Sequence, residues 1–480
     1  MNKQSEKLAK AIAYEAKKKK ERDEDKRPAF HVTPTTGWCN DPNGFSRFGE
    51  EYHLFYQYYP YENKWGPMHW GHCRTKDFIK WEELPCALAP DMEYDGQGCF
   101  SGTAVEHEGK HILMYTSVLE KDLEDGTHMV RQTQSIAIGD GENYEKVAEN
   151  PVITADCLPE GSSPVDFRDP KIWKEDGRFY ALIGSKAEDG SGQLALFTSE
   201  DALHWNYEKM IDQCKNRYGK MWECPDFFAL DGCQVLIVSS QFMRAEGLEF
   251  HNGNNSIYFT GDYEKETMTY TRGDARQVDY GMDFYAPQTT ELPDGRRIMI
   301  AWMKSWDACV IPNSQDWQGM MTLPRELELK DGKIWQTPVR EIEKYHKNPC
   351  RYDHAEINQE TTLCGIEGRT IDLTVLLEED EFQTFSMKLA ANKEYETSFT
   401  YHKAENMLEI DRTYCGVTKD VVCVRKLKIS NPEGLKKMRF ILDRQSIELF
   451  LNDGEQVATT AICTPLEAQE IHFYSDKKIH

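Results

Sequence analysis

The chain has 480 residues, which is long for a single hydrophobic core and predicts two or more domains. Its 57 lysine and arginine residues are outnumbered by 81 aspartate and glutamate residues, and the formal net charge is −24. Nucleic acids and anionic membranes are polyanions that such a chain repels, so both are excluded as expected partners. Aromatic residues make up 11% of the chain, a supply that suits aromatic-rich β-structure or a carbohydrate site.

Cysteine spacing and hydropathy indicate further which class of protein the chain belongs to. The 14 cysteines include no C-x-x-C pair, so the ligand spacing of a structural zinc site is missing, and we expect no metal and no cofactor. No stretch reaches the ~20 apolar residues of a membrane span, and residues 1–27 lack the apolar run of a secretory signal. Many single cysteines without such a signal predict reduced thiols and a cytoplasmic protein.

Residues 1–27 favour an N-terminal helical extension. Leu8 and Ile12 are spaced to form a narrow apolar stripe on one face of a helix. The run Lys17–Lys20 indicates a solvent-exposed face, so this helix is expected to lie at the periphery of the protein.

Residues 28–337 consist of short apolar runs separated by turn signals, with almost no helical periodicity, which predicts an all-β region. The clearest strands are Tyr52–Tyr59, Lys110–Tyr115, Arg178–Ile183, Gln234–Ser239 and Arg297–Trp302. Each is preceded by a short turn motif: Asn40–Asn43, Phe100–Gly102, Arg168–Pro170, Glu223–Asp226 and Ala286–Gln288. The motifs recur at intervals of roughly 55–70 residues, which predicts a five-bladed β-propeller whose first strands line a central channel. A large β-sandwich, or two stacked ones, is the alternative, and the even spacing favours the propeller.

The propeller pattern ends before residues 338–350, which read as a linker with a short helix near Val339–Tyr345. Alternating apolar patterns return over residues 351–480 and predict a C-terminal β-sandwich. Its expected strands include Ile371–Leu377, Phe385–Leu389, Met438–Leu442 and Ser446–Leu451. This region carries no carboxylate in a turn motif, so we expect it to be structural.

The stretch Trp38–Gly44 holds a carboxylate in a rigid turn. Proline fixes its own φ and Asn-Gly tolerates positive φ, so Asp41 is tightly placed, and Trp38 offers a flat apolar face of the kind that sugar rings pack against. The stretch alone is equally consistent with a turn whose aspartate only caps its own backbone.

Two further motifs supply Asp169 and Glu223, and three carboxylates suit glycosidic bond cleavage. That reaction needs one carboxylic acid to protonate the leaving oxygen and a second carboxylate on the other side of the anomeric carbon. Asp41 suits the nucleophile, and apolar neighbours suit Glu223 to remain protonated as the acid. Arg168 beside Asp169 would hold that aspartate ionised, as a stabiliser of positive charge.

These motifs together resemble glycoside hydrolase family 32, the family of invertases, β-fructofuranosidases and sucrose-6-phosphate hydrolases. The resemblance covers about residues 31–327 and rests on Asn40–Gly44, Phe55–Tyr58, Trp65–His72, Phe100–Gly102, Phe167–Pro170, Glu223–Asp226, Asp283–Gln288 and Ala301–Met303. Residues Phe440–Ala458 are similar to the family's C-terminal sandwich.

The resemblance implies a retaining mechanism with Asp41 as nucleophile, Asp169 as transition-state stabiliser and Glu223 as acid/base. It also implies that the fructosyl unit is held by Asn40, Gln57, Trp65, Phe100, Ser101 and Arg168. Among further candidates, Asp283 and Tyr285 share a strand face and are expected at the rim of the channel, and Trp302 suits either blade core or a sugar platform. Cys39 departs from the larger apolar residue usual in the family, and we expect it to narrow the wall behind Asp41 and to place a thiol near the site.

We therefore predict a retaining glycosidase that releases terminal β-fructosyl units from sucrose, sucrose 6-phosphate or short fructo-oligosaccharides. Assembly of the protein into a homo-oligomer is compatible with the sequence. A fructosyl-transferring enzyme and a sugar-binding propeller that has lost hydrolysis are the alternatives. A propeller glycosidase of the arabinan-cleaving type is a third, and it is not supported by the Trp38–Gly44 and Phe100–Gly102 motifs.

Overall fold

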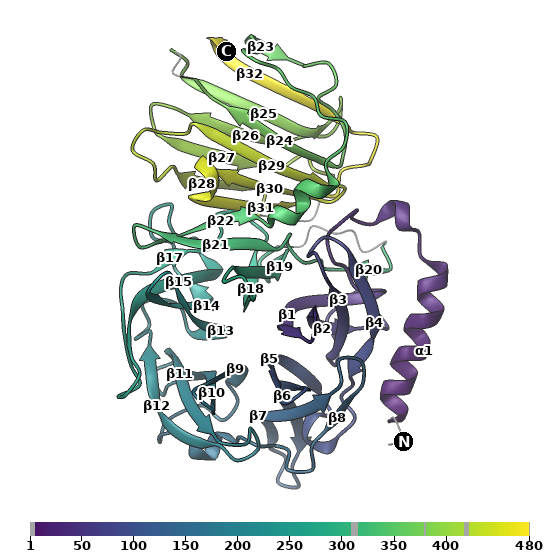
Figure 1. The fold of residues 1–480 in the computed structure, drawn as a ribbon, viewed down its shortest axis with the longest axis vertical. Coiled ribbons are helices and arrows are strands. Elements are labelled where there is room, and N and C mark those ends of the chain that lie inside the picture. The colour runs from purple at the N-terminus through teal and green to yellow at the C-terminus, as the bar shows by residue number, and fades with distance from the viewer. Residues whose placement is uncertain (1–4, 309–314, 379–380, 417–421, 480) are drawn as a thin grey trace.

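The computed structural model describes residues 5–308, 315–378, 381–416 and 422–479. Within these residues the structure is all-β with one α-helix, as the sequence predicts (Figure 1). Helix α1 spans Glu6–Glu21, and Ser5 caps its start by accepting a hydrogen bond from the backbone N–H of Leu8. The predicted stripe of Leu8 and Ile12 packs against the apolar core beneath the helix. Among the helices described, none is long and apolar enough to cross a membrane.

Five antiparallel sheets surround a common centre (Figure 1). We call them sheets 1 to 5 in chain order. Sheet 1 comprises β1 (Gly37–Phe48), β2 (Glu51–Tyr59), β3 (His69–Thr75) and β4 (Trp81–Leu88), joined by the parallel strand β20 (Trp317–Gln318). Sheet 2 comprises β5 (Gly98–His107), β6 (Lys110–Asp122), β7 (His128–Gly139) and β8 (Tyr144–Lys146). Sheet 3 comprises β9 (Phe167–Glu175), β10 (Arg178–Lys186), β11 (Gly192–Ser199) and β12 (Asn206–Gln213).

Sheet 4 comprises β13 (Met221–Leu230), β14 (Cys233–Met243), β15 (Gly253–Glu264) and β16 (Thr269–Arg272), with β17 (Arg276–Gln277) paired to β15. Sheet 5 comprises β18 (Tyr285–Glu291), β19 (Arg297–Trp302), β21 (Arg325–Lys330) and β22 (Lys333–Pro338). The innermost strands in Figure 1 are β1, β5, β9, β13 and β18. Each carries one of the five turn motifs at or near its start, so the fold brings all five motifs to one end of the centre.

Every innermost strand has a β-bulge at its motif. The register shifts at Asp41, Ser101, Asp169, Cys224 and Ala286. A proline follows the bulged residue in four of these strands, and a bulge is one of the few places where a sheet tolerates proline because the residue there need not donate to the ladder. Bulges re-aim side chains, which explains why turn-forming residues mark the functional end of each strand.

Short 3-10 helices occur at η1 (Glu24–Lys26), η2 (Glu93–Asp95), η3 (Ala155–Cys157), η4 (Arg340–Tyr345) and η5 (Asn452–Gly454). The helix predicted at Val339–Tyr345 is therefore confirmed as η4.

The C-terminal part contains two further sheets that share one hydrophobic core. One comprises β23 (Ile357–Thr361), β25 (Thr384–Ala391), β26 (Thr397–His402), β27 (Met407–Asp411), β28 (Val424–Lys428) and β32 (Glu470–Ile479). The other comprises β24 (Ile371–Leu376), β29 (Lys437–Asp443), β30 (Ser446–Leu451) and β31 (Gln456–Ala461). Phe399 and Phe440, one from each sheet, meet edge to face with ring centroids 5.1 Å apart.

A buried charge network joins the C-terminal sheets to the rest of the protein. Arg325 on β21 pairs with Asp279 and with Glu448 on β30, and Glu448 also lies 2.9 Å from His31. The imidazole of His31 contacts Asp443 at 2.7 Å as well. Burial lowers the pKa of His31, but these two carboxylates raise it to about 9, so the imidazole is charged at neutral pH. The network therefore pairs buried charges from three distant parts of the chain.

Candidate active site

Asp41 is a buried carboxylate on the bulge of β1. Its Oδ2 accepts a hydrogen bond of 2.7 Å from the hydroxyl of Ser101 on β5, and its Oδ1 accepts one of 3.1 Å from Asn40. The indole of Trp38 in turn donates to Asn40 at 2.8 Å. Burial and the nearby charge of Glu223 raise the pKa of Asp41, while the hydrogen bonds from Ser101 and Asn40 lower it.

Asn43 and Gln288 fix the bulge of β1 against its neighbours. The amide of Asn43 donates to the carbonyl of Asp41 at 2.8 Å and accepts from the backbone N–H of Gly102 on β5 at 3.0 Å. Gln288 on β18 donates to the carbonyl of Gly102 and accepts from the backbone N–H of Phe45. Three innermost strands are thus joined by side-chain amides, and Asp41 is held in one position.

Asp169 lies on the bulge of β9 with a positive φ of 66°. Its Oδ2 accepts a hydrogen bond of 3.0 Å from the backbone N–H of Cys224. Burial and the charge of Glu223 raise the pKa of Asp169 to about 7, against the lowering effect of Arg168. Arg168 acts on Asp169 in the predicted direction, since it favours the ionised form, but burial and the charge of Glu223 oppose it.

Glu223, near the start of β13, is the residue that Arg168 contacts. The guanidinium donates to Oε1 at 3.0 Å from Nε, and its second nitrogen lies 2.9 Å from the same oxygen. Tyr285 on β18 donates to Oε2 at 2.7 Å. Both oxygens of Glu223 are therefore oriented by polar groups, where the sequence indicated an apolar setting. Arg168 is itself held by Asp166 at 2.9 Å.

Cys224 connects the two aspartates, and sequence reasoning did not assign it a role. Its Sγ lies 3.5 Å from Oδ2 of Asp41 and 3.5 Å from Oδ2 of Asp169, so the two oxygens are at most twice that distance apart. Its position within the Glu223–Asp226 motif is the feature of the sequence that could have identified it as a site residue. Cys39, the cysteine that we expected near the site, is instead buried in the core behind β1, where Gly319 packs against it.

The predicted residues Gln57, Trp65 and Phe100 lie beside this centre. Gln57 is buried on β2 and donates to the carbonyl of Cys99 at 3.0 Å, next to Phe100. The exposed ring of Trp65 meets Phe100 edge to face, with centroids 5.9 Å apart. These aromatic side chains form an apolar margin on the side of sheets 1 and 2.

A second aromatic group involves three tryptophans. Trp302 is fully buried and meets the rings of Trp38 and Trp306 edge to face at centroid distances of 6.0 and 5.0 Å. Trp306, which sequence reasoning missed, stacks on Trp38 at 6.2 Å and keeps an exposed face. Trp302 thus supports the other two rings and offers no free face of its own.

The structure does not bring Asp283 to this site. Its side chain is fully buried, forms an ion pair with Arg412 of the C-terminal part, and accepts from the backbone N–H of Ala461 at 2.8 Å. Strand β18 begins at Tyr285, so the alternation that was expected to place Asp283 and Tyr285 on one face does not apply. Tyr285 reaches Glu223, whereas Asp283 connects the C-terminal sheets to the rest of the fold.

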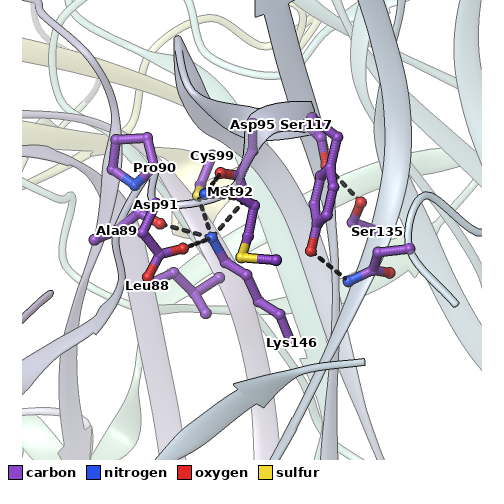
Figure 2. Close-up of polar contacts among 12 residues, drawn as sticks. Leu88, Ala89, Pro90, Asp91, Met92, Asp95, Cys99, Ser117, Ser135 and Lys146 are labelled. Carbon is purple, nitrogen blue, oxygen red and sulfur yellow. Dashed lines mark hydrogen bonds and ion pairs between the residues drawn. The ribbon is translucent and has the colours of Figure 1, made fainter. Parts of the chain in front are cut away.

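A largely buried ion cluster around Lys146 supports the start of β5 and is shown in Figure 2. The ammonium of Lys146 lies 2.5 Å from carboxylate oxygens of Asp91 and Asp95, and 3.8 Å from Sγ of Cys99. Asp95 also accepts a hydrogen bond of 2.9 Å from Tyr115 on β6. Since Cys99 precedes Phe100 and Ser101, this cluster fixes the backbone that presents both predicted residues.

Within the part of the chain that the structure describes, no group of three or more His, Cys, Asp or Glu side chains is arranged to hold a metal ion. The centre instead offers three carboxylates from three strands, flanked by aromatic rings. Glycosidic bond hydrolysis requires a pair of carboxyl groups, and aromatic rings offer apolar faces on which a sugar ring packs, so the fold and the site indicate a glycosidase.

Comparison with known proteins agrees with this class. A family model described as glycosyl hydrolases family 32 N-terminal domain matches residues 31–338, and one described as glycosyl hydrolases family 32 C terminal matches residues 341–480. The chain belongs to glycosyl hydrolase family 32, and the predicted family is confirmed.

Similar proteins and structures extend along nearly the whole chain. A sucrose-6-phosphate hydrolase of Zymomonas mobilis is 38% identical over 449 residues, covering 89% of this chain and 84% of the relative. A raffinose invertase of Escherichia coli is 33% identical, covering 93% of this chain and 92% of the relative. Among solved structures, a mutant β-fructofuranosidase of Bombyx mori in complex with sucrose matches with a TM-score of 0.87 and 32% identity, covering 99% of this chain and 97% of that one.

Proposed function

We propose that the protein hydrolyses terminal β-fructosyl linkages with retention of configuration, using Asp41 as nucleophile, Glu223 as acid/base and Asp169 as stabiliser. The relatives confirm the predicted class, a fructosyl-releasing glycoside hydrolase. The observation that carries the proposed roles is the different set of partners around each carboxylate. Asp41 accepts hydrogen bonds from a neutral hydroxyl and a neutral amide, Glu223 is oriented by a cation and a phenol, and Asp169 accepts from a backbone N–H.

In the first step, an oxygen of Asp41 attacks the anomeric carbon of the fructosyl unit while Glu223 donates its proton to the departing glycosidic oxygen. The hydroxyl of Ser101 holds the attacking carboxylate in place. The product is a fructosyl ester of Asp41 and a free leaving-group sugar.

In the second step, Glu223, now a carboxylate, takes a proton from water, and that water attacks the anomeric carbon and releases Asp41. Both transition states carry positive charge on the fructosyl ring. That charge favours the ionised form of Asp169 and opposes burial and Glu223, which raise its pKa. The carboxyl groups of Asp41 and Glu223 are predicted to lie ~5–5.5 Å apart, as a retaining enzyme requires.

For the architecture we propose that sheets 1 to 5 are the blades of a five-bladed β-propeller over residues 28–337. Residues 1–27 form an N-terminal extension and residues 338–350 a linker, and residues 351–480 form a β-sandwich. Five sheets around one centre, each with its motif strand innermost, support this division.

For the substrate we propose a small fructoside, namely sucrose, sucrose 6-phosphate or a short fructo-oligosaccharide, cleaved in the cytoplasm. The names of the relatives support sucrose and its 6-phosphate, and the net charge of −24 argues against a polyanionic partner. A fructosyl-transferring enzyme would differ only in the acceptor that intercepts the ester.

The test compares release of fructose from sucrose, sucrose 6-phosphate and 1-kestose by one preparation. Glucose and fructose are both quantified, since an excess of glucose over fructose from sucrose reports transfer. Asp41→Ala is expected to abolish turnover of all three substrates. Asp41→Asn serves as a matched variant of nearly equal size, and substantial activity in either would refute the proposed nucleophile.

A further inference from the structure

Three exposed aromatic side chains stand at the same end of three different sheets. The motif-bearing strands begin at the end that carries the carboxylates, so the second strand of each sheet finishes there. Trp65 follows the end of β2, Phe242 lies at the end of β14, and Trp306 follows the end of β19. Among the described residues, the other exposed aromatic rings, Tyr352 and Tyr414, belong to the C-terminal part.

Phe242 is unusual in its backbone as well as in its exposure. It is 65% exposed and its φ is +58°, a left-handed conformation that bulky residues rarely adopt. Of the large apolar side chains in the described residues, it alone combines exposure with a positive φ. Neither folding nor solubility requires an aromatic ring in such a place, where glycine would fit without strain.

The register places Phe242 close to the catalytic carboxylate of sheet 4. Ser239, three residues earlier on β14, pairs with Glu223, and its carbonyl lies 3.2 Å from the hydroxyl of Tyr285. The bulge between Ser240 and Met243 then carries Phe242 beyond this pair.

The same strand end is tied to the segment that bears Trp306. Met243 pairs with Gly253, and the backbone N–H of the next residue, Asn254, donates to Asp307 at 2.6 Å. The segments of Phe242 and Trp306 are thus linked through the start of β15, at the end of the sheets that carries the carboxylates.

We propose that Phe242 is a binding platform for the leaving-group sugar, so that the enzyme selects fructosides whose leaving group is a sugar ring over those with a small alcohol. The inference rests on the proposed function. Protonation by Glu223 occurs on the glycosidic oxygen, so the leaving group extends outward past Glu223, on the side where β14 ends. An exposed aromatic face beside it packs against the C–H face of a hexose ring and removes apolar surface from water.

Phe242→Gly tests this inference, because glycine accepts the positive φ and the variant is expected to fold at least as well as the parent. We compare kcat/KM for sucrose and for methyl β-D-fructofuranoside, which has the same fructosyl unit and no leaving-group ring. The variant is expected to lose about three- to tenfold on sucrose, the size of one aromatic contact, and to keep its value on the methyl fructoside. Phe242→Trp keeps an aromatic ring at this position and is expected to retain the kcat/KM of the parent enzyme on sucrose.

Tyr414→Ala removes a comparably exposed ring, 63% exposed in the C-terminal part, and is expected to change neither substrate. Equal losses on both fructosides, no loss on sucrose, or a changed oligomeric state with unchanged kinetics would each overturn the role of Phe242. Failure of the unmodified enzyme to cleave either fructoside would instead refute the proposed function, so the two failures are distinguishable.

Discussion

The hydrogen bond from Ser101 to Asp41 gives the sharpest test of the catalytic geometry, through the variant Ser101→Ala. Both side chains are buried, and the donor–acceptor distance is 2.7 Å. A hydrogen bond to a charged group contributes about 1.5–3 kcal/mol, and one pKa unit corresponds to about 1.4 kcal/mol. Since this bond lowers the pKa of Asp41, its loss is expected to raise that pKa.

The assay is the pH profile of kcat/KM for sucrose. A nucleophile must be ionised, so the acid limb of the profile is expected to move to higher pH in Ser101→Ala. A contribution of about 1.5–3 kcal/mol corresponds to a roughly ten- to hundredfold lower kcat/KM at a pH below the limb, with much of the rate recovered above it. Ser117→Ala is the matched control: Ser117 is an equally buried hydroxyl on the adjacent strand β6 that donates to Ser135 at 2.5 Å, away from the carboxylates. A uniform loss of rate with an unmoved acid limb would refute the assignment of that limb to Asp41.

Three further predictions concern residues outside the catalytic centre. Lys146→Met removes the cation that supports the start of β5. It is expected to lower kcat/KM about tenfold because the backbone that presents Phe100 and Ser101 is displaced, and Lys146→Arg is expected to restore part of the loss. Burial raises the pKa of Glu15 on α1 from 4.5 to about 7, so its stabilising contribution is present below pH 4.5 and is lost as pH rises through 7. Glu15→Gln is therefore expected to flatten the dependence of Tm on pH between 5 and 8, and an unchanged slope would contradict this. Asp283→Ala breaks the buried ion pair with Arg412 and is expected to cost about 3 kcal/mol in chemical denaturation while kcat/KM stays within about twofold; a large kinetic loss in folded protein would place Asp283 in the site after all.

Much of the site could be predicted because its signals are local. Turn-forming residues with a carboxylate recur before apolar strands, and the structure places each of these motifs on a bulge of an innermost strand. The interval between motifs matches one sheet of four or five strands, so the sequence period and the sheet topology agree.

The errors arise where side chains from different sheets meet. Adjacency to Asp169 indicated that Arg168 serves that aspartate, yet its guanidinium contacts Glu223 on the next sheet. Trp306 and Cys224 were not assigned because their significance lies in contacts with Trp38 and with the two aspartates, which only the closed arrangement creates. Asp283 was assigned to the site by strand alternation, and β18 begins two residues later.

The buried network around Arg325 and Glu448 was equally invisible in the sequence. Its members come from the N-terminal segment, sheet 5 and the C-terminal sheets, and no local pattern links them. Charged residues are rarely buried unless they are paired, and the partners of each of these residues lie far away in the sequence.

The anomeric configuration of the first fructose released tests the central claim most directly. Rapid NMR observation of sucrose cleavage, faster than mutarotation, distinguishes the two products. The double displacement through Asp41 predicts that β-D-fructofuranose appears first. Initial formation of the α-anomer would show inversion, and it would contradict both the covalent ester on Asp41 and the role of Glu223 as acid and then base.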